Sequence, residues 1–362
     1  MRVEGIDIKH KLNNNLKIFI LGIIFISLIC ISNINVKVTK NISSNNSNEE
    51  LIFSTYDTDG KSSITKVNPE TKEQSILISN QDVWLSGNLS DDKSSLVYMN
   101  ALGKETWQVF SLDLKTKQIK KLTTNKLGKF GGKAGDNDTI YFEVIDPSSA
   151  LSKIVKYNIK DNSSIIFDEL DKDRVTEVYD IRDNKIIAVM NSNSEEEKRR
   201  TEANKTQTPI KPIEYSIYEI NSDNSNMKKI ASINATKIDN ISYNYDCKKA
   251  IISGENIDNE NCYGIYEVST ENGQVTKLLT DDMIFNNKNY IISAINNSYA
   301  VMSKNGNVLY FSGAPKGGGN ILFQDITSMP QNVYSYNLKT NKIEKVYENG
   351  KPTIITDLTI AY

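Results

Sequence analysis

Chemistry that requires an imidazole is excluded from nearly all of this chain. Its 362 residues include a single histidine, His10, which precedes a long apolar run near the N-terminus. The rest of the chain therefore has no Ser–His–Asp or Cys–His arrangement and no histidine-bearing zinc site. With 43 basic against 45 acidic residues, it also lacks the surplus of Lys and Arg that nucleic-acid binding requires. We assign no catalytic residue, no cofactor and no metal ligand from the sequence.

Carboxylate chemistry remains open, because calcium is bound through oxygen ligands alone. The turn Asp57–Gly60 (Asp-Thr-Asp-Gly) has the spacing of half a calcium loop, although Asp and Gly are also favoured in any hairpin turn. The acidic run Asp168–Arg174 is interpreted as a solvated connector. Cys247 and Cys262 are expected to remain unpaired, because the expected hairpin register separates them by about 26 Å at ~3.3 Å per residue.

The N-terminal 48 residues divide into three segments by charge and polarity. Residues 18–36 carry no charge and, as a helix, would span about 28 Å, close to the ~30 Å hydrocarbon core of a bilayer. We interpret 1–17, with its four basic residues, as a cytoplasmic tail, 18–36 as a transmembrane anchor and 37–48 as a polar linker. This predicts a single-pass protein of the cytoplasmic membrane, with its N-terminus inside and its body, 49–362, outside. A cleaved signal peptide is the alternative, although the residues before Cys30 are not the small ones that usually precede a cleavage site.

The body is built from repeats of about 45 residues. Short segments rich in Val, Ile, Tyr and Phe alternate with turns of Asn, Asp, Gly and Lys, and no segment keeps a helical apolar period. One turn recurs, and the two longest spacings between its copies contain insertions. The copies begin at Asn68, Asp113, Asn158, Asn221, Ser269 and Asn337. Each unit contains four predicted strands, which is typical of a β-propeller blade.

Counting predicts how the ring closes. The chain after Asn337 and the chain from Glu49 to Asn68 together make up one further period. The tail Thr353–Ala361 is therefore expected to supply the innermost strand of a blade whose other three strands come from the N-terminal end of the body. A blade shared in this way leaves no open sheet edge at the joint. The predicted fold is all-β, a six-bladed β-propeller with a shared closing blade, preceded by a single transmembrane helix.

The turn ahead of the second strand resembles that of the TolB-type, WD-like propeller repeat, which has a Ser-Pro-Asp-Gly-Lys-like sequence. The nearest copy is Leu89–Met99 (LSDDKSSLVYM), with weaker copies at Tyr243–Ser253 and Met302–Ser312. All three lack the proline of the family, so the resemblance indicates the architecture specifically but does not identify a subfamily. It implies a six-bladed extracytoplasmic scaffold.

Two long insertions fall between the second and third strand of a unit, so they are expected on one face of the ring, flanking the fifth blade. The first, residues 191–213, is interpreted as a solvated loop. The second, residues 313–331, either folds back over the ring mouth or presents a docking patch, because it contains apolar residues in an expected loop. The candidate partner-binding residues are Lys316, Ile321, Leu322, Phe323, Arg199 and Arg200.

These features favour a membrane-anchored propeller that acts as a non-enzymatic interaction scaffold in the cell envelope. Its partner is expected to be an envelope protein or a cell-wall polymer. Two alternatives remain open: a propeller that binds a small molecule or a carbohydrate in its central funnel, and a calcium- or carboxylate-dependent hydrolase or lactonase. The hydrolase requires acidic and Asn side chains from several blades to converge at the channel.

Overall fold

The computed structural model describes residues 49–362, apart from 82, 84–86, 102–105, 137, 146–150, 296 and 325. The predicted cytoplasmic tail, transmembrane anchor and linker, residues 1–48, lie outside the described residues. Within the described ranges, no helix is long and apolar enough to cross a membrane.

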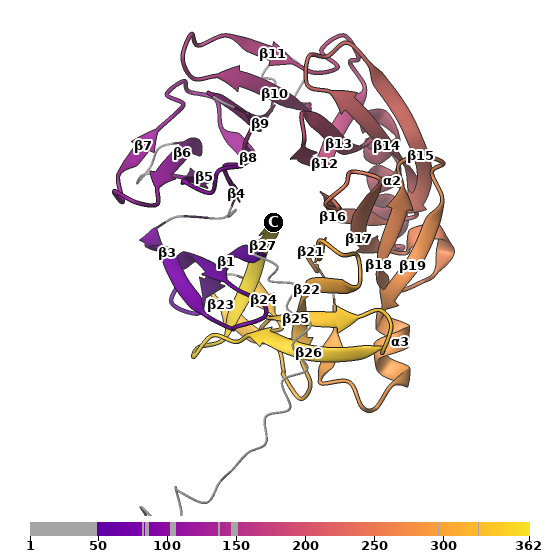
Figure 1. Cartoon of the computed structure of the whole chain (residues 1–362). Coiled ribbons are helices and arrows are strands. Elements are labelled where there is room, and N and C mark those ends of the chain that lie inside the picture. The colour runs from indigo at the N-terminus through magenta and orange to yellow at the C-terminus, as the bar shows by residue number, and fades with distance from the viewer. Residues whose placement is uncertain are drawn as a thin grey trace, which may run out of the picture. The chain divides into compact units, whose positions relative to one another are not determined.

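Six antiparallel sheets follow one another around a ring, as the repeat predicts (Figure 1). We number them as blades 1 to 6 in chain order, and each runs from an innermost strand at the axis to an outer strand at the rim. Blade 1 comprises β27 (Thr353–Ala361), β1 (Glu50–Asp57), β2 (Ser62–Val67) and β3 (Gln74–Gln81). Blade 2 comprises β4 (Asn88–Leu89), β5 (Ser95–Asn100), β6 (Gln108–Asp113) and β7 (Ile119–Lys121). Blade 3 comprises β8 (Lys129–Ala134), β9 (Thr139–Ile145), β10 (Ser152–Asn158) and β11 (Ser164–Ile166).

The remaining blades carry the additional elements of the chain. Blade 4 comprises β12 (Arg174–Arg182), β13 (Lys185–Ser192), β14 (Ile213–Asn221) and β15 (Met227–Ala235). Blade 5 comprises β16 (Lys237–Tyr243), β17 (Lys249–Glu255), β18 (Tyr263–Ser269) and β19 (Val275–Thr280). Blade 6 comprises β20 (Ile292–Ala294), β21 (Ala300–Met302), β22 (Val308–Pro315), β25 (Asn332–Asn337) and β26 (Lys342–Tyr347). The other elements are α2 (Asn193–Thr206), η1 (Ile257–Asn259), α3 (Asp281–Asn286) and the hairpin of β23 (Ile321–Phe323) and β24 (Ile326–Ser328).

The recurring turn joins the third and fourth strands of a blade and has a local cause. In blade 1 the Asn68 side chain accepts hydrogen bonds from the backbone N–H groups of Glu70 and Thr71. Lys72 then takes a left-handed conformation, with a φ of 64°. The residues at the same position of the other copies with positive φ are Lys117, Asn162, Gly273 and Asn341, and in the copy that begins at Asn221 the positive φ falls one residue earlier, at Asn224. Because Asn and Asp side chains bond to the backbone two residues on, these local signals set the register of the outer strand pairs.

The strand β27 closes the ring, as counting predicts. It pairs antiparallel with β1 along both strands, with one bulge after Ser54. The hydroxyl groups of Ser54 and Thr356 are hydrogen-bonded at 2.6 Å, and Leu358 is buried. The innermost strand of blade 1 therefore comes from the C-terminal end of the chain, and its other three strands come from the N-terminal end of the body.

The hydrophobic core of the described body consists of six clusters, one between each pair of neighbouring blades. Between blades 4 and 5, Ile187 and Ile217 belong to the same cluster as Ile241 and Ile252. Successive residues of a strand point to opposite faces of its sheet, so each blade contributes to the cluster on either side of it. Packing between blades therefore holds the ring together and leaves the axis to polar side chains.

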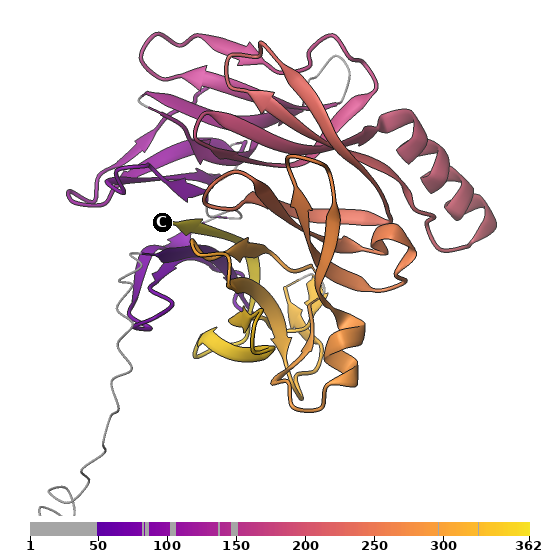
Figure 2. The ribbon, with the colours of Figure 1, turned by 45° about the vertical axis from the view of Figure 1, so that its right-hand side comes forward.

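Residues 191–213 do not form the solvated loop that was interpreted from the sequence. They contain α2, a helix of 14 residues that projects from blade 4 (Figure 2). Ser192 caps the helix by accepting the backbone N–H of Glu195, and Asp173 accepts the backbone N–H of Ser194 at 2.7 Å. Capping of this kind satisfies the free N–H groups of the first turn, so the helix forms although only two of its residues are buried.

Candidate functional site

The loops of the ring lie on two faces. One face is formed by the connections between second and third strands and by those between successive blades, and we call it the insertion face because α2 and the β23–β24 hairpin belong to it. The opposite face carries the turns between first and second strands and between third and fourth strands. Both insertions thus share one face, as expected, although the β23–β24 hairpin of the second lies against blade 1 and not beside blade 5 (Figure 1).

Most of the large exposed apolar side chains of the described residues lie on the insertion face. Leu170, in the connection between blades 3 and 4, is 91% exposed, Phe285 in α3 is 86% exposed and Leu322 in β23 is 62% exposed. The others on this face are Phe130, Ile145, Ile210, Ile291 and Ile326. Of the remaining described ones, Tyr245 lies on the opposite face, and the outer strands carry Ile76, Ile119, Ile165 and Ile166. Exposed apolar side chains on one face are candidates for contact with a partner.

The second insertion folds back onto the ring as the β23–β24 hairpin. Phe323 is fully buried, whereas its neighbour Leu322 is exposed and Ile321 is partly buried. The Tyr56 hydroxyl donates a hydrogen bond to Gln324 Oε1 at 2.7 Å, which ties the hairpin to β1. The segment therefore folds back against blade 1, not over the ring mouth, and the docking patch stays a prediction for which Leu322 is available. Lys316 is exposed, and its ammonium group donates to the carbonyl oxygen of Lys288 at 2.6 Å.

Arg199 and Arg200 are adjacent in α2 but have different environments. Arg199 is 8% exposed, and its guanidinium group pairs with Glu196 and donates to the Lys211 carbonyl oxygen at 2.8 Å and to the Tyr215 hydroxyl at 3.0 Å. Arg200 is exposed and also pairs with Glu196. Arg199 thus anchors the helix to blade 4. Arg199 and Phe323 are buried, whereas the other candidate partner-binding residues are exposed at least in part.

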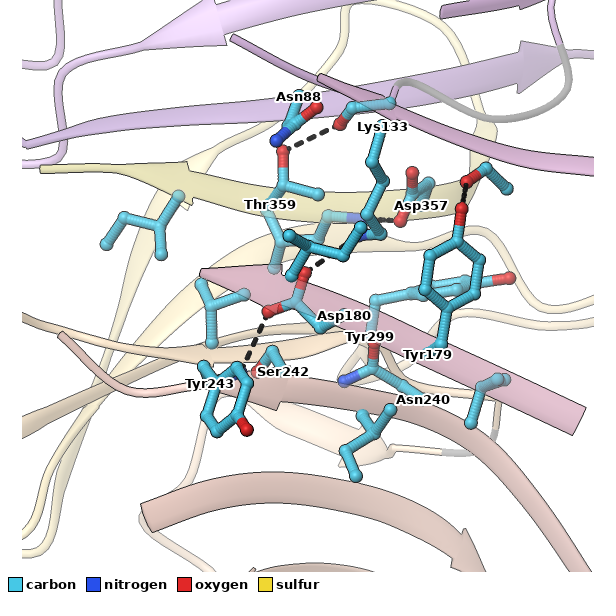
Figure 3. A pocket seen from close by; sticks show the side chains of 18 of the residues that line it. Asn88, Lys133, Tyr179, Asp180, Asn240, Ser242, Tyr243, Tyr299, Asp357 and Thr359 are labelled. Carbon is cyan, nitrogen blue, oxygen red and sulfur yellow. Dashed lines mark hydrogen bonds and ion pairs between the residues drawn. The ribbon is translucent and has the colours of Figure 1, made fainter. Parts of the chain in front are cut away.

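A funnel lies on the axis of the ring, lined by the innermost strand of every blade (Figure 3). Its cavity has a volume of about 230 Å³. The lining reaches the insertion face at Phe130 and Glu177, which are both exposed. Toward the opposite face it adjoins a second cavity of about 140 Å³, where the Arg182 guanidinium lies 4.4 Å from the centre of the Tyr362 ring.

Side chains in the funnel join neighbouring blades. These bonds run from donor to acceptor as Thr359 to Gly87, Ala134 to Asn88, Tyr243 to Asp180, Asn240 to Ala300 and Ser242 to Ala300. Each bond connects the innermost strand of one blade with the innermost strand of the neighbouring blade, or with the residue just before that strand. The polar lining of the funnel is therefore also part of what fixes the blades relative to one another.

Lys133 is the central cation of the funnel (Figure 3). Its Nζ lies 3.0 Å from Oδ1 of Asp180, whose Oδ2 accepts the backbone N–H of Tyr243 at 2.8 Å. Burial favours the neutral amine, but the charges of Asp180 and Asp357 outweigh that effect, so the pKa of Lys133 is raised. The ion pair joins blades 3 and 4, and Asp180 extends the connection to blade 5.

Three further carboxylates, those of Glu143, Glu177 and Asp239, line the funnel. Burial raises the pKa of Glu143 to about 7; a hydrogen bond from Ser152, at 2.6 Å, acts against this rise, and the charge of Glu177 adds to it. Partial removal of water between the strands that line the funnel likewise raises the pKa of the Glu177 carboxyl group. Asp239 accepts a hydrogen bond from the Tyr263 hydroxyl at 2.9 Å. Acidic side chains from several blades thus converge on the axis.

Metal-binding geometry is not found in the part of the chain that the structure describes, where no three Asp, Glu, Cys or His side chains group closely enough to hold an ion. The turn with the spacing of half a calcium loop uses its carboxylates in other ways. Asp57 Oδ1 accepts the backbone N–H groups of Asp59 and Lys61 at 3.0 and 2.9 Å, and Asp59 pairs with Lys351 at 2.8 Å. These bonds are those of a turn closed by an aspartate side chain.

Reasoning from the sequence did not identify the funnel carboxylates. The available signal was an acidic residue within an otherwise apolar or uncharged run that the repeat places innermost in its blade. Such residues are Asp180, Asp239 and Asp357. Their partners could not be read from the pattern, because Lys133 and Asp180 are 47 residues apart and meet only through the curvature of the ring.

The arrangement of the body defines its class, the six-bladed β-propellers. The structure of TolB from Acinetobacter baumannii is similar, with a TM-score of 0.60 and 11% identity over 86% of this chain and 66% of that one. A putative TolB from Agrobacterium tumefaciens has a TM-score of 0.54 and 10% identity, over 86% and 98% of the two chains. A chain of a nidogen/laminin complex has a TM-score of 0.54 and 12% identity, over 87% and 98%.

Within that class, the described body has the TolB-like form that the turn sequence predicts. This chain covers slightly less than two thirds of the TolB from Acinetobacter baumannii. No family model matches the sequence, and no curated protein matches it. At identities of 10 to 12%, the likeness concerns the fold alone.

Proposed function

We propose that this protein is a membrane-anchored, extracytoplasmic scaffold that binds an envelope protein, or else a cell-wall polymer, through its insertion face. The observation that carries the proposal is that most of the large exposed apolar side chains lie on this face, led by Leu170, Phe285 and Leu322. Such side chains cost free energy in water and are stabilised when a partner covers them. The TolB-like fold supports the proposal, because members of the family that the turn sequence resembles are extracytoplasmic scaffolds.

The position of Glu49 also supports binding through the insertion face. One oxygen of its carboxylate accepts the backbone N–H of Lys304 at 2.7 Å, in the turn between β21 and β22. The described chain therefore begins on the face opposite the insertion face. The insertion face is therefore not the face on which the first described residues lie.

A carboxylate-dependent hydrolase or lactonase is the second candidate. The convergence of Glu143, Glu177 and Asp239 in the funnel favours it, since such an enzyme needs acidic side chains from several blades at the axis. Two of the funnel carboxylates are already occupied: Asp180 by its bonds to Lys133 and Tyr243, and Asp239 by its bonds to Lys237 and Tyr263. Hydrolysis of simple lactones and esters by the purified full-length chain, abolished by Glu143→Gln, would favour this candidate over the scaffold.

Replacing two exposed apolar residues of the insertion face should abolish partner capture without unfolding the ring. For the variant F285S/L322S we expect at least a tenfold loss of the proteins or polymers that copurify with the tagged full-length chain. Its thermal unfolding should change little, because surface substitutions usually alter stability by about 0.5 kcal/mol or less each.

The matched control is I76S/I119S, which removes exposed apolar side chains from the outer strands β3 and β7. This control should retain its partners. Equal capture by F285S/L322S and the unchanged protein would exclude the insertion face as the binding surface.

A further inference from the structure

The funnel carries an excess of negative charge where it meets the insertion face. The carboxylates in its lining are Glu143, Glu177, Asp180, Asp239 and Asp357, and the cations are Lys133 and Arg182. Lys237, just outside the lining, pairs with Asp239, so five acidic groups meet three basic ones. Acidic groups close to one another repel when they are ionised, so the excess of acidic groups favours the approach of a cation to the funnel.

The uncompensated charge is concentrated at Glu143 and Glu177. No described Lys or Arg lies within 4.0 Å of either carboxylate, and the hydrogen bond to Glu143 comes from the neutral hydroxyl of Ser152. Arg199 and Arg200 lie near Glu177, but both pair with Glu196. Lys133, the nearest funnel cation, is bound to Asp180. The mouth of the funnel is therefore complementary to a positively charged group supplied from outside.

The dimensions and walls of the funnel indicate what kind of cation it suits. The carboxylates are not grouped in threes as an inorganic ion would require. The cavity of about 230 Å³ is smaller than the roughly 300–1,000 Å³ typical of small-molecule sites, so one extended side chain suits it better than a whole cofactor. Phe130, which is 40% exposed, and Tyr299 add aromatic rings to the lining, and such rings attract organic cations.

We propose that the funnel mouth is the specificity pocket of the insertion face and receives a lysine or arginine side chain of a partner protein. An apolar residue beside this basic residue packs on the exposed ring of Phe130, which belongs to the funnel itself, and apolar residues farther along the partner contact the other exposed apolar side chains of the insertion face. This inference rests on the proposed scaffold function and specifies the chemistry of its partner: a segment in which one basic residue lies between apolar ones. Charge in the funnel then gives specificity, while apolar area on the face gives affinity.

The experiment selects binding peptides from a random library displayed on phage, with the full-length chain as bait. The selected peptides should share one Lys or Arg flanked by apolar residues. Replacing that residue by norleucine in a synthetic copy should weaken binding at least tenfold, and the variant E143Q/E177Q should weaken binding of the unchanged peptide to the same extent. The control E214Q/E267Q removes two carboxylates that pair with surface lysines and should leave binding unchanged.

The outcomes separate this inference from the scaffold function. If F285S/L322S abolishes peptide binding but E143Q/E177Q does not, the insertion face binds partners and the basic pocket is wrong. Peptides without a basic residue, or a selection that yields none, overturn the inference as well. Calcium chloride is the remaining probe. If calcium displaces the peptide, and if it raises the unfolding temperature of the unchanged chain but not that of E143Q/E177Q, the funnel binds an inorganic ion and the basic pocket is wrong.

Discussion

Deleting residues 353–362 should leave a chain that no longer folds cooperatively. The deletion removes β27, the innermost strand of blade 1, whose buried apolar residues are Ile354, Ile355, Leu358 and Ile360. Four such side chains at about 2 kcal/mol each amount to about 8 kcal/mol, which is comparable with the roughly 5–15 kcal/mol that stabilises a whole domain. The loss also leaves the inner edge of β1 unpaired, and an open edge of this kind favours aggregation.

The measurement is thermal unfolding followed by circular dichroism, together with the elution volume of the truncated chain. A synthetic peptide with the sequence of residues 353–362 provides the control, because it should restore the transition when it is added in excess. A truncated chain that unfolds cooperatively at the temperature of the intact protein would show that the ring does not depend on the shared blade.

Replacing Lys133 by methionine should destabilise the ring by about 3–5 kcal/mol, the usual cost of leaving one partner of a buried ion pair unpaired. Asp180 would then be buried without a cation, next to Asp357 on the neighbouring side of the funnel. The change should appear in denaturant unfolding as a lower midpoint with an unaltered slope.

The double variant K133M/D180N distinguishes lost charge pairing from lost packing. The amide that replaces the Asp180 carboxylate carries no charge, and its oxygen can still accept the backbone N–H of Tyr243, so the double variant should recover a large part of the lost stability. The surface control K342M removes a lysine that is 70% exposed and pairs with Glu344, itself 56% exposed, and should cost less than about 1 kcal/mol. A K133M protein as stable as the unchanged chain would contradict the structural role of the pair.

The ring could be predicted from the sequence because its signals are local and repeated. The turns that begin at Asn68 and its copies depend on side chains bonding to the nearby backbone, and alternation within each strand requires no knowledge of the neighbouring blades. The closing strand followed from counting residues against the period, and the structure pairs Thr353–Ala361 with β1 as expected. Cys247 and Cys262 are both free, which was also predicted.

The helix α2 was missed because it lacks the apolar stripe that usually reveals a surface helix. Its stability depends on the Ser192 side chain, which caps its N-terminus, and on the buried Arg199 side chain, which donates a hydrogen bond to the Tyr215 hydroxyl. The Ser-Asn-Ser-Glu sequence from 192 to 195 has the spacing of a capping box, so a signal was present in the sequence. It was outweighed by the strongly polar composition of the segment.

The acidic run Asp168–Arg174 shows a second way in which composition misleads. It was interpreted as a solvated connector, but Arg174 pairs with Asp168 at 3.0 Å. Lys153, which is 6% exposed, donates to the backbone carbonyl oxygens of Asp168, Asp171 and Arg174. This lysine lies in the preceding blade, so its role depends on tertiary structure that no local pattern contains. The funnel charges were missed for the same reason.

Site-specific photo-cross-linking is the most direct test of binding through the insertion face. A photoreactive residue is placed at Leu170 or Leu322 on that face, or at Asp246 or Asn272 on the opposite face, in the full-length chain within the cell that produces it. All four positions are exposed. Binding through the insertion face predicts one adduct of the same mass from Leu170 and Leu322 and none from the other two. Adducts from Asp246 and Asn272 alone, or from all four positions alike, would contradict it.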